Sequence, residues 1–386
     1  MVTLQNAENA LKTVYLGTMT DLLNTRVNPL LSKIEQTTAD VWGKEIRTAA
    51  RFGINGGVGA GDEDGDLPAP NGNNYLQFVT TLKNLYGQIE ISDKAIRASK
   101  DGSGAFTDLL NAELEGLLTA SKFNLGRMLY GDGSGLLATF SVKTENSKTE
   151  TTCDTVRNLI EGLVVDIYAD GATTKKATAR IKYVDRPAKK VTFDGSVTIA
   201  DGDKMYVQGS KDKEITGIGA LFSGDSIYGV QKSAHPFLTP YSKNVNGNID
   251  EIAIQEAIDT LENEAGSTVD FIACSQDAKY SYIDCMMSYK RNIDVMELEG
   301  GFKTLAYNGI PLVYDRFVPE GSMYLLNTKA FKLHQLCDWR FLETENGKIL
   351  RQNQGKPTYT ATLVKYCDLI CQKPNGQAVL TGINRT

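Results

Sequence analysis

The longest regular pattern in this sequence is a stripe of apolar side chains across residues 103–130. The stripe recurs every three to four residues, as one face of an α-helix does. Its members are Phe106, Leu109, Leu110, Leu114, Leu117, Leu118, Leu125, Met128 and Leu129. About 25 helical residues span on the order of 37 Å, and the run Gly131-Asp132-Gly133-Ser134-Gly135 ends the helix. Any fold for this chain must therefore accommodate one long helix.

The first 50 residues are mostly polar, and their apolar stripe is thin. Its members recur at roughly helical spacing around Pro29, and they are Leu22, Leu23, Leu30, Leu31 and Ile34. Short helices owe most of their stability to packing. We therefore expect residues 1–50 to form an arm that needs a partner surface.

Residues 51–74 are rich in glycine, acids and proline, and this composition predicts a mobile connection. Two strand-like runs follow at residues 75–82 and 85–91. We expect Lys83-Asn84 to connect them as a hairpin. Because a two-stranded ribbon is not stable alone in water, a projecting hairpin needs another surface to hold it.

Within that connection, four acids stand in five positions. They are Asp62, Glu63, Asp64 and Asp66. A glycine run precedes them, but four carboxylates would repel the phosphate that such a run could otherwise bind. The acids also fit the start of a calcium loop, although Leu67 and Asn73 stand where that loop needs Gly and Glu. We interpret the segment as an exposed acidic loop tip, with a calcium site as the alternative.

Residues 143–228 change to a pattern of short strands. The strand-like runs are Leu163–Tyr168, Ala177–Val184, Lys190–Phe193, Ser196–Ile199 and Lys204–Val207. The turn pairs between them are Asp170-Gly171, Asp194-Gly195 and Asp201-Gly202. The pattern predicts a small all-β insertion. It holds 13 basic and 13 acidic residues, so the net charge of −6 lies outside it.

The insertion also contains a local basic stretch. Its members are Lys175, Lys176, Arg180, Lys182, Arg186, Lys189 and Lys190. Solvated strand faces are the favoured interpretation, and a docking patch for an acidic neighbour is the alternative.

Residues 249–335 alternate between helix and strand patterns, which predicts a compact α/β unit. Its expected elements are a helix at 250–264, a strand at 269–274, a helix capped by Ser275, and strands at 310–314 and 323–326. We expect Tyr280, Ile283 and Met287 to form the inward face of the second helix. A β pattern returns at residues 357–383.

Composition and motifs exclude several classes of function. A net charge of −6 and a pI near 5.3 disfavour direct binding to nucleic-acid phosphates. The sequence holds no run of 18 apolar residues and no signal-peptide pattern. Its two histidines form no zinc motif, and its six cysteines form no CxxC pair, so we expect reduced, buried thiols. We predict no catalytic residue, no metal site and no cofactor, and we favour a structural role.

The order of these segments resembles that of the major capsid protein of tailed bacteriophages, which has the Hong Kong 97-type fold with an α+β architecture. The segments that carry the resemblance are Asp64-Gly65-Asp66-Leu67-Pro68, Arg127-Met128-Leu129-Tyr130-Gly131-Asp132-Gly133-Ser134-Gly135 and Gly300-Gly301-Phe302-Lys303-Thr304-Leu305-Ala306-Tyr307-Asn308-Gly309-Ile310-Pro311-Leu312-Val313. The resemblance covers nearly the whole chain outside residues 143–228. The order of all segments is more specific than any one motif.

The resemblance implies a role for each segment. The implied segments are an N-arm at 1–50, an extended β-hairpin loop at 51–100, a peripheral domain with the spine helix at 101–142, an insertion domain at 143–228, an axial domain at 229–340 and peripheral return strands at 341–386. It implies a structural protein that self-assembles into hexamers and pentamers of an icosahedral phage head around double-stranded DNA. Such a protein assembles in the bacterial cytoplasm and ends in the virion capsid. Because the sequence begins almost at the arm, we expect a separate scaffolding protein, a portal, a possible decoration protein and no membrane partner.

The residues that we expect to contact neighbouring subunits lie in the loop. They are Asp62, Glu63, Asp64, Asp66, Lys83 and Asn84. Certain relatives cross-link a loop lysine to a neighbour's asparagine, but nothing in this sequence identifies the partner of Lys83, so we do not carry that chemistry over. Three alternatives stay open: a cellular nanocompartment (encapsulin-like) shell protein that shares the fold, a hydrolase or carbohydrate-active enzyme with scattered carboxylates, and a tail or adhesin protein.

Overall fold

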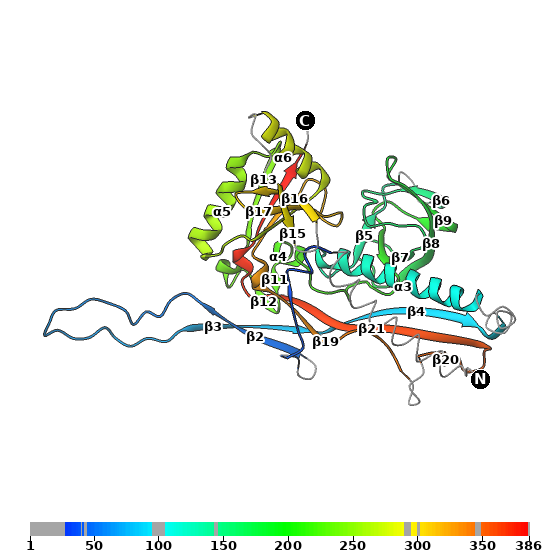
Figure 1. Ribbon diagram of the computed structural model, residues 1–386, viewed down its shortest axis with the longest axis horizontal. Helices are drawn as coiled ribbons and strands as arrows, with labels where there is room; N and C mark the ends of the chain where they lie inside the picture. The colour runs from blue at the N-terminus through cyan, green and yellow to red at the C-terminus, as the bar shows by residue number, and fades with distance from the viewer. Residues whose placement is uncertain are drawn as a thin grey trace.

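The computed structural model describes residues 28–39, 41, 45–94, 105–142, 146–288, 295–298, 302–343 and 349–384. The molecule has an elongated base, two lobes above it and a ribbon that extends far to one side (Figure 1). Most of the predicted arm, Leu22 and Leu23 included, lies outside the described residues. In the described part, Leu30, Leu31 and Ile34 are buried in the core of this same chain. That part of the arm therefore packs on its own subunit, contrary to our expectation that it needs a partner.

The base is a five-stranded sheet on which helix α3 (Ala105–Leu129) lies, as the apolar stripe predicts. The strands are β1 (Glu35–Thr37), β4 (Lys83–Ser92), β19 (Phe331–Phe341), β20 (Arg351–Gln352) and β21 (Thr358–Cys371). Strand β4 runs antiparallel to β21 along its whole length. Its side chains Leu85 and Ile89 are buried in the same core as Leu118 and Leu125 of the helix.

The six-stranded lobe lies above the base and has a core of its own, which includes Phe140, Ile167 and Phe193. In sheet order its strands are β5 (Leu136–Thr139), β10 (Lys204–Val207), β7 (Val164–Tyr168), β8 (Lys175–Asp185), β9 (Lys190–Ile199) and β6 (Asn146–Thr152). The predicted strands at 163–168, 177–184 and 204–207 coincide with β7, β8 and β10, whereas the two predicted at 190–193 and 196–199 form the single strand β9. The turn predicted at Asp194-Gly195 is wrong, because the pair lies inside β9, between residues whose side chains alternate into the core.

The seven-stranded lobe contains the other two long helices of the described residues, α5 (Glu251–Ala265) and α6 (Gln276–Ser288). In sheet order its strands are β13 (Tyr241–Gly247), β22 (Ala378–Ile383), β18 (Met323–Leu326), β14 (Phe271–Cys274), β17 (Ile310–Tyr314), β16 (Phe302–Tyr307) and β15 (Val295–Leu298). Strand β22 pairs with β13 and β18. The prediction that all of residues 341–386 returns to the base is therefore wrong for this last strand.

Helix α6 is turned opposite to our prediction. Tyr282 and Met286 are buried, whereas Tyr280 and Met287 are exposed and Ile283 is half-buried. The helix carries apolar residues on both sides, so periodicity alone could not say which side faces the sheet. The row that the fold buries is Ala278, Tyr282 and Met286.

The chain returns from the six-stranded lobe to the base along residues 214–231. The short elements here are α4 (Gly219–Phe222), β11 (Ser226–Ile227) and β12 (Val230–Gln231), and three 3₁₀ turns lie further along at Pro236–Leu238, Thr328–Ala330 and Pro374–Gly376. Ile218 donates its N–H to the Leu129 carbonyl at 2.8 Å, so this return segment lies directly against the end of α3.

A side chain at Gly217 would collide with that helix end. A Cβ atom there would lie 2.3 Å from the Met128 carbonyl oxygen and 2.5 Å from that of Gly131. Because backbone oxygens cannot move aside easily, we expect Gly217→Ala to lower the free energy of unfolding by about 1–3 kcal/mol. The measurement is urea denaturation, and Gly195→Ala, where a Cβ meets no atom within 4 Å, is the matched control. Equal stabilities of the two variants would contradict the close approach.

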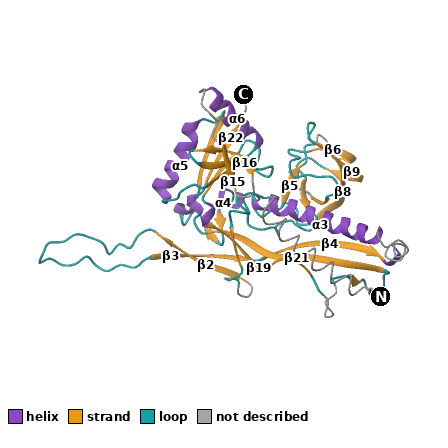
Figure 2. Cartoon of the chain, viewed as in Figure 1, coloured by secondary structure: helices purple, strands orange, loops and turns teal. Residues whose placement is uncertain are grey.

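Figure 2 shows helix α3 along the strands of the base and helices α5 and α6 beside the strands of one lobe, and this mixture of helices and sheets is the predicted α+β architecture. Among the described residues, none of the helices combines the length and the apolar character that a membrane crossing requires.

Candidate assembly interface

The projecting ribbon (residues 45–81) is the most distinctive surface of the molecule. Strands β2 (Glu45–Phe52) and β3 (Asn74–Thr81) pair antiparallel, from Glu45 opposite Thr81 to Phe52 opposite Asn74. Residues 53–73 continue beyond this pair as the irregular end of the ribbon (Figure 1). The ribbon points away from both lobes, so its outer part contacts little of its own subunit.

The predicted hairpin between residues 75–82 and 85–91 is wrong. Strand β3 pairs with β2, and β4 pairs with β21. The physical reason is burial: Leu85, Ile89 and Ile91 of β4 all enter the core under α3, which a two-stranded ribbon could not offer. The sequence signal for β2 is weak, because in this strand only Ile46 is buried.

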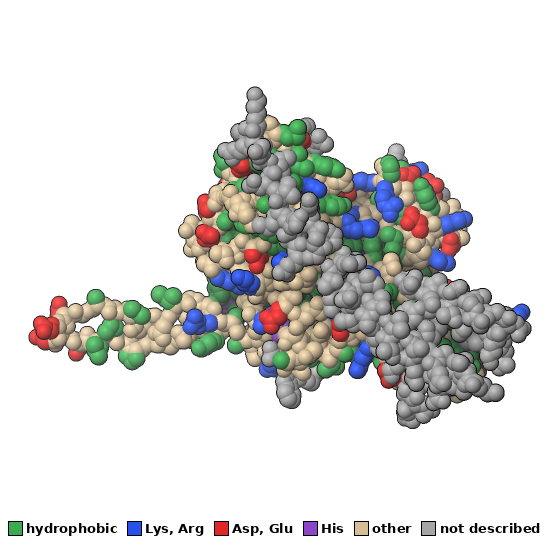
Figure 3. Space-filling model, viewed as in Figure 1, with side chains coloured by type: hydrophobic (Ala, Val, Ile, Leu, Met, Phe, Trp, Pro, Cys, Tyr) green, Lys and Arg blue, Asp and Glu red, His purple; other side chains and the backbone are tan. Residues whose placement is uncertain are grey.

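The outer end of the ribbon combines acids with exposed apolar side chains. Asp62, Glu63, Asp64 and Asp66 are all exposed, and the Gly65 N–H donates to the Asp62 carbonyl at 3.1 Å to close a turn. The acids gather at the far end in Figure 3, with apolar side chains along the ribbon behind them. The acidic tip is therefore where the sequence predicts it.

Three of those apolar side chains are almost completely exposed: Ile54 by 87%, Val58 by 84% and Leu67 by 90%. Fully burying one such side chain is worth about 1.5–3 kcal/mol. A surface that exposes three of them beside four acids is typical of an interaction site rather than of a free surface.

The base of the ribbon, in contrast, is anchored. Phe78 is fully buried, with its ring 5.6 Å from that of Tyr228, and the Val79 N–H donates to the Tyr228 carbonyl at 3.0 Å. At the outer end of the β2–β3 ladder, Phe52 stacks on Phe237 with ring centroids 4.7 Å apart. The paired strands of the ribbon are thus held on the body, and residues 53–73 form its outer part.

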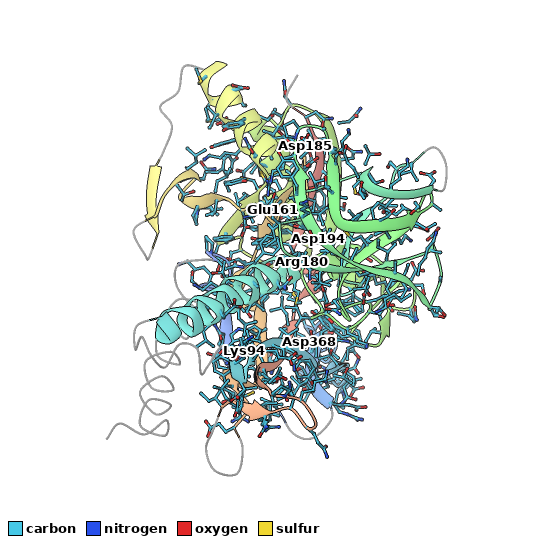
Figure 4. The ribbon with its side chains drawn as sticks, turned by 90° about the vertical axis from the view of Figure 1, so that its right-hand side faces the viewer. Lys94, Glu161, Arg180, Asp185, Asp194 and Asp368 are labelled. Atoms are coloured by element: carbon cyan, nitrogen blue, oxygen red, sulfur yellow. The ribbon has the colours of Figure 1, made fainter. Side chains whose placement is uncertain are left out.

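A buried carboxylate, Asp368 of β21, completes the root (Figure 4). It accepts hydrogen bonds from the Thr80 hydroxyl and from the N–H of Thr216 at 2.7 Å. Burial raises the pKa of Asp368, while the bonds from Thr80 and Thr216 and the charge of Lys83 act in the opposite direction. Sequence reasoning missed this residue, although an acid inside the apolar run Tyr366–Cys371 is a signal, since a buried carboxylate needs donors around it.

Lys83 and Asn84 do not lie at the tip. They begin β4, opposite Cys367 and Tyr366. Both line a groove of about 630 Å³ between β4, α3 and residues 207–214 of the six-stranded lobe. The six candidate contact residues therefore fall into two groups, with the acids on the ribbon and the Lys83-Asn84 pair on the body.

The basic stretch of the insertion is largely neutralised within its own lobe. Lys175 lies 3.3 Å from Asp166 and Lys176 lies 3.0 Å from Asp203, measured between charged atoms. Further pairs within the lobe are Lys190–Glu150 and Arg186–Glu161, and Lys189 pairs outside it with Glu320, between β17 and β18. Arg180 donates from Nε to the Gly162 carbonyl at 3.4 Å. These pairs favour the solvated strand face over a docking patch.

The thiols and acids offer little chemistry. None of the six cysteines, all of which lie in the described ranges, forms a disulfide bond, and burial raises the pKa of Cys153, Cys274, Cys367 and Cys371 to about 12. Thiols with such pKa values are poor nucleophiles. Within the described ranges, no three His, Cys, Asp or Glu side chains come together in a way that could hold a metal ion.

No protein-family model and no curated protein matches this sequence. Solved structures do match. A chain of the cyanophage A-1(L) capsid is 13% identical with a TM-score of 0.58, over 93% of this chain and 94% of that chain. The SrpI encapsulin from Synechococcus elongatus is 10% identical with a TM-score of 0.50, over 93% of this chain and 89% of that chain. The chain therefore has the Hong Kong 97-type fold, which is found in both phage capsids and encapsulin shells.

Proposed function

We propose that this chain is the major capsid protein of a tailed bacteriophage and that it has a structural rather than a catalytic role. Copies of it would assemble into hexamers and pentamers of an icosahedral head that encloses double-stranded DNA. The observation that carries the proposal is the ribbon, which has an anchored base and an outer end with three exposed apolar side chains. Contacts to neighbouring copies can offset the entropy of ordering such an extension.

The segments take the following roles in this proposal. The ribbon (residues 45–81) serves as the extended loop, shorter at its C-terminal end than the sequence indicates, because β4 belongs to the base. The base with α3 serves as the peripheral domain, and residues 143–228 serve as the insertion domain. The seven-stranded lobe serves as the axial domain around the symmetry axes. A separate scaffolding protein, a portal and a decoration protein are the partners that we propose beyond the chain itself.

An encapsulin-like shell is the second candidate, because the SrpI encapsulin shares the fold. The six-stranded lobe disfavours it, since such shells usually lack an insertion. Electron microscopy of the purified particles tests both candidates, together with an assay of their contents. Closed icosahedral shells with packaged DNA, after production in the phage's own host, support the capsid. A packaged enzyme supports the nanocompartment, and failure to form any shell contradicts both.

The four acids at the ribbon end give a prediction about assembly. If they meet cations on a neighbouring copy, neutralising them as Asp62→Asn, Glu63→Gln, Asp64→Asn and Asp66→Asn should slow shell formation at low salt. The same change should remove most of the salt dependence of assembly, because exposed charges are screened over about 10 Å at 0.1 M salt. Light scattering at several salt concentrations measures both effects. A variant with the three aspartates changed to glutamate keeps the charge and serves as the control; equal salt dependence in all three proteins would contradict the contact.

A further inference from the structure

The outer part of the ribbon can act on a neighbour only in a defined direction, and its root sets that direction. Beyond the β2–β3 ladder, the ten residues from Asp64 to Asn74 cover on the order of 33 Å at about 3.3 Å per residue. A tilt of the ladder by about 10° would therefore move the tip by about 6 Å. Displacements of this size separate groups that must touch, so small contacts at the root have large consequences at the tip.

At the root, Asp368 joins three segments of the chain. Its Oδ1 atom accepts the N–H of Thr216 at 2.7 Å and the N–H of Leu369 at 3.0 Å. Its Oδ2 atom accepts the hydroxyls of Thr80 and Thr216, the latter at 3.3 Å. Asp368 is fully buried, and a buried carboxylate is tolerated only where donors surround it. The ribbon, the return segment and β21 are thus held around one charged group.

The return segment (residues 214–231) is held against α3 by buried contacts on both sides of Thr216. Two residues before Thr216, Glu214 pairs with Arg127 of α3, and both side chains are buried. One residue after it, Gly217 lies against the carbonyl oxygens at the end of α3. Thr216 therefore connects Asp368 to the place where the six-stranded lobe rejoins the base.

We infer that Asp368 is a positioning residue for assembly. Its carboxylate fixes the direction in which the ribbon leaves the body, and it links that direction to residues 214–217, where the six-stranded lobe rejoins the base. The consequence for shells rests on the proposed function. The direction of the ribbon is a property of the single subunit, and it is measured in unassembled subunits.

The test measures ribbon direction in unassembled subunits by double electron–electron resonance. Spin labels on noncanonical amino acids at Ala60 and Ile252, both exposed, report the outer ribbon against the body, and a pair at Tyr183 and Ile252 reports the body alone. We expect Asp368→Ala to widen the Ala60–Ile252 distance distribution about twofold, because donors lose their shared acceptor, and to leave the reference pair unchanged. Asp368→Asn keeps one acceptor oxygen, and the threonine hydroxyls can turn to accept from its amide, so we expect the narrow distribution to persist.

Thr80→Val is the decisive milder variant, since it removes the ribbon's bond to Asp368 and leaves the Thr216 bonds in place. It decides the question if Asp368→Ala does not fold. We expect both variants to lower the shell yield about tenfold, because misdirected tips lose their contacts, whereas Asp368→Asn assembles. An unchanged distribution in Thr80→Val overturns the inference, and so does a widened distribution with normal shell yield. Absence of shells from the unmodified protein overturns the proposed function instead, while the distance distributions still decide the role of Asp368.

Discussion

Subunits without residues 53–73 are expected to fold normally and to form no shells. Phe52 and Asn74 lie opposite each other at the end of the ribbon ladder, so a two-residue Asn-Gly turn can join them without distorting the strands. The buried root residues Ile46 and Phe78 remain in place. The excision removes the acids and the three exposed apolar side chains together, and with them the surface that we propose contacts the neighbouring copy.

Circular dichroism and urea denaturation measure folding of this variant, and electron microscopy with sedimentation measures assembly. Deletion of Thr173 and Thr174, which are exposed in the turn between β7 and β8, is the control and should leave assembly intact. Shells of normal yield from the ribbon excision would show that the ribbon is not the assembly contact. An unfolded subunit would show that residues 53–73 stabilise the fold, although their exposed side chains indicate that they do not.

The parts of the fold that could be predicted from the sequence are those with local patterns. Helix α3 has a long one-sided stripe, and the strands of the six-stranded lobe are strand-like runs separated by turns such as Asp170-Gly171. Strand pairing is different, because it depends on which surface offers more burial. The β3 run could pair with either neighbour in sequence, and the core under α3 decides that β4 joins β21 instead.

The candidate site divides along the same line. Charge and glycine content predict an exposed acidic tip, and the structure confirms it. The sequence pattern wrongly places Lys83 in a hairpin turn, because its position on the body depends on the pairing of β4 with β21. Asp368 acts through Thr80 and Thr216, which are 288 and 152 residues away in sequence. No local pattern can reveal contacts at such separations, although a lone acid within an apolar strand indicates that some must exist.

Breaking the buried ion pair between Arg127 and Glu214 is expected to have the largest effect on stability. The pair is bidentate, with N–O distances of 2.8 and 2.5 Å, and the side chains are 4% and 3% exposed. Removing one partner leaves an uncompensated buried charge, so we expect Arg127→Met to lower the free energy of unfolding by about 3–5 kcal/mol. Urea denaturation of unassembled subunits measures the loss.

A double variant separates the charge from the packing. Replacing a whole buried pair by apolar residues is often neutral or stabilising, so Arg127→Met with Glu214→Leu should recover most of the loss. The exposed pair Lys243–Glu256 provides the control, and Lys243→Met should change the urea midpoint little. If the double variant is as unstable as the single one, the pair acts through shape rather than charge. If the double variant recovers stability but assembles poorly, the pair holds the six-stranded lobe in the orientation that neighbouring copies require. That result would link the orientation of the lobe to the ribbon, because Thr216 follows Glu214 closely and donates to Asp368.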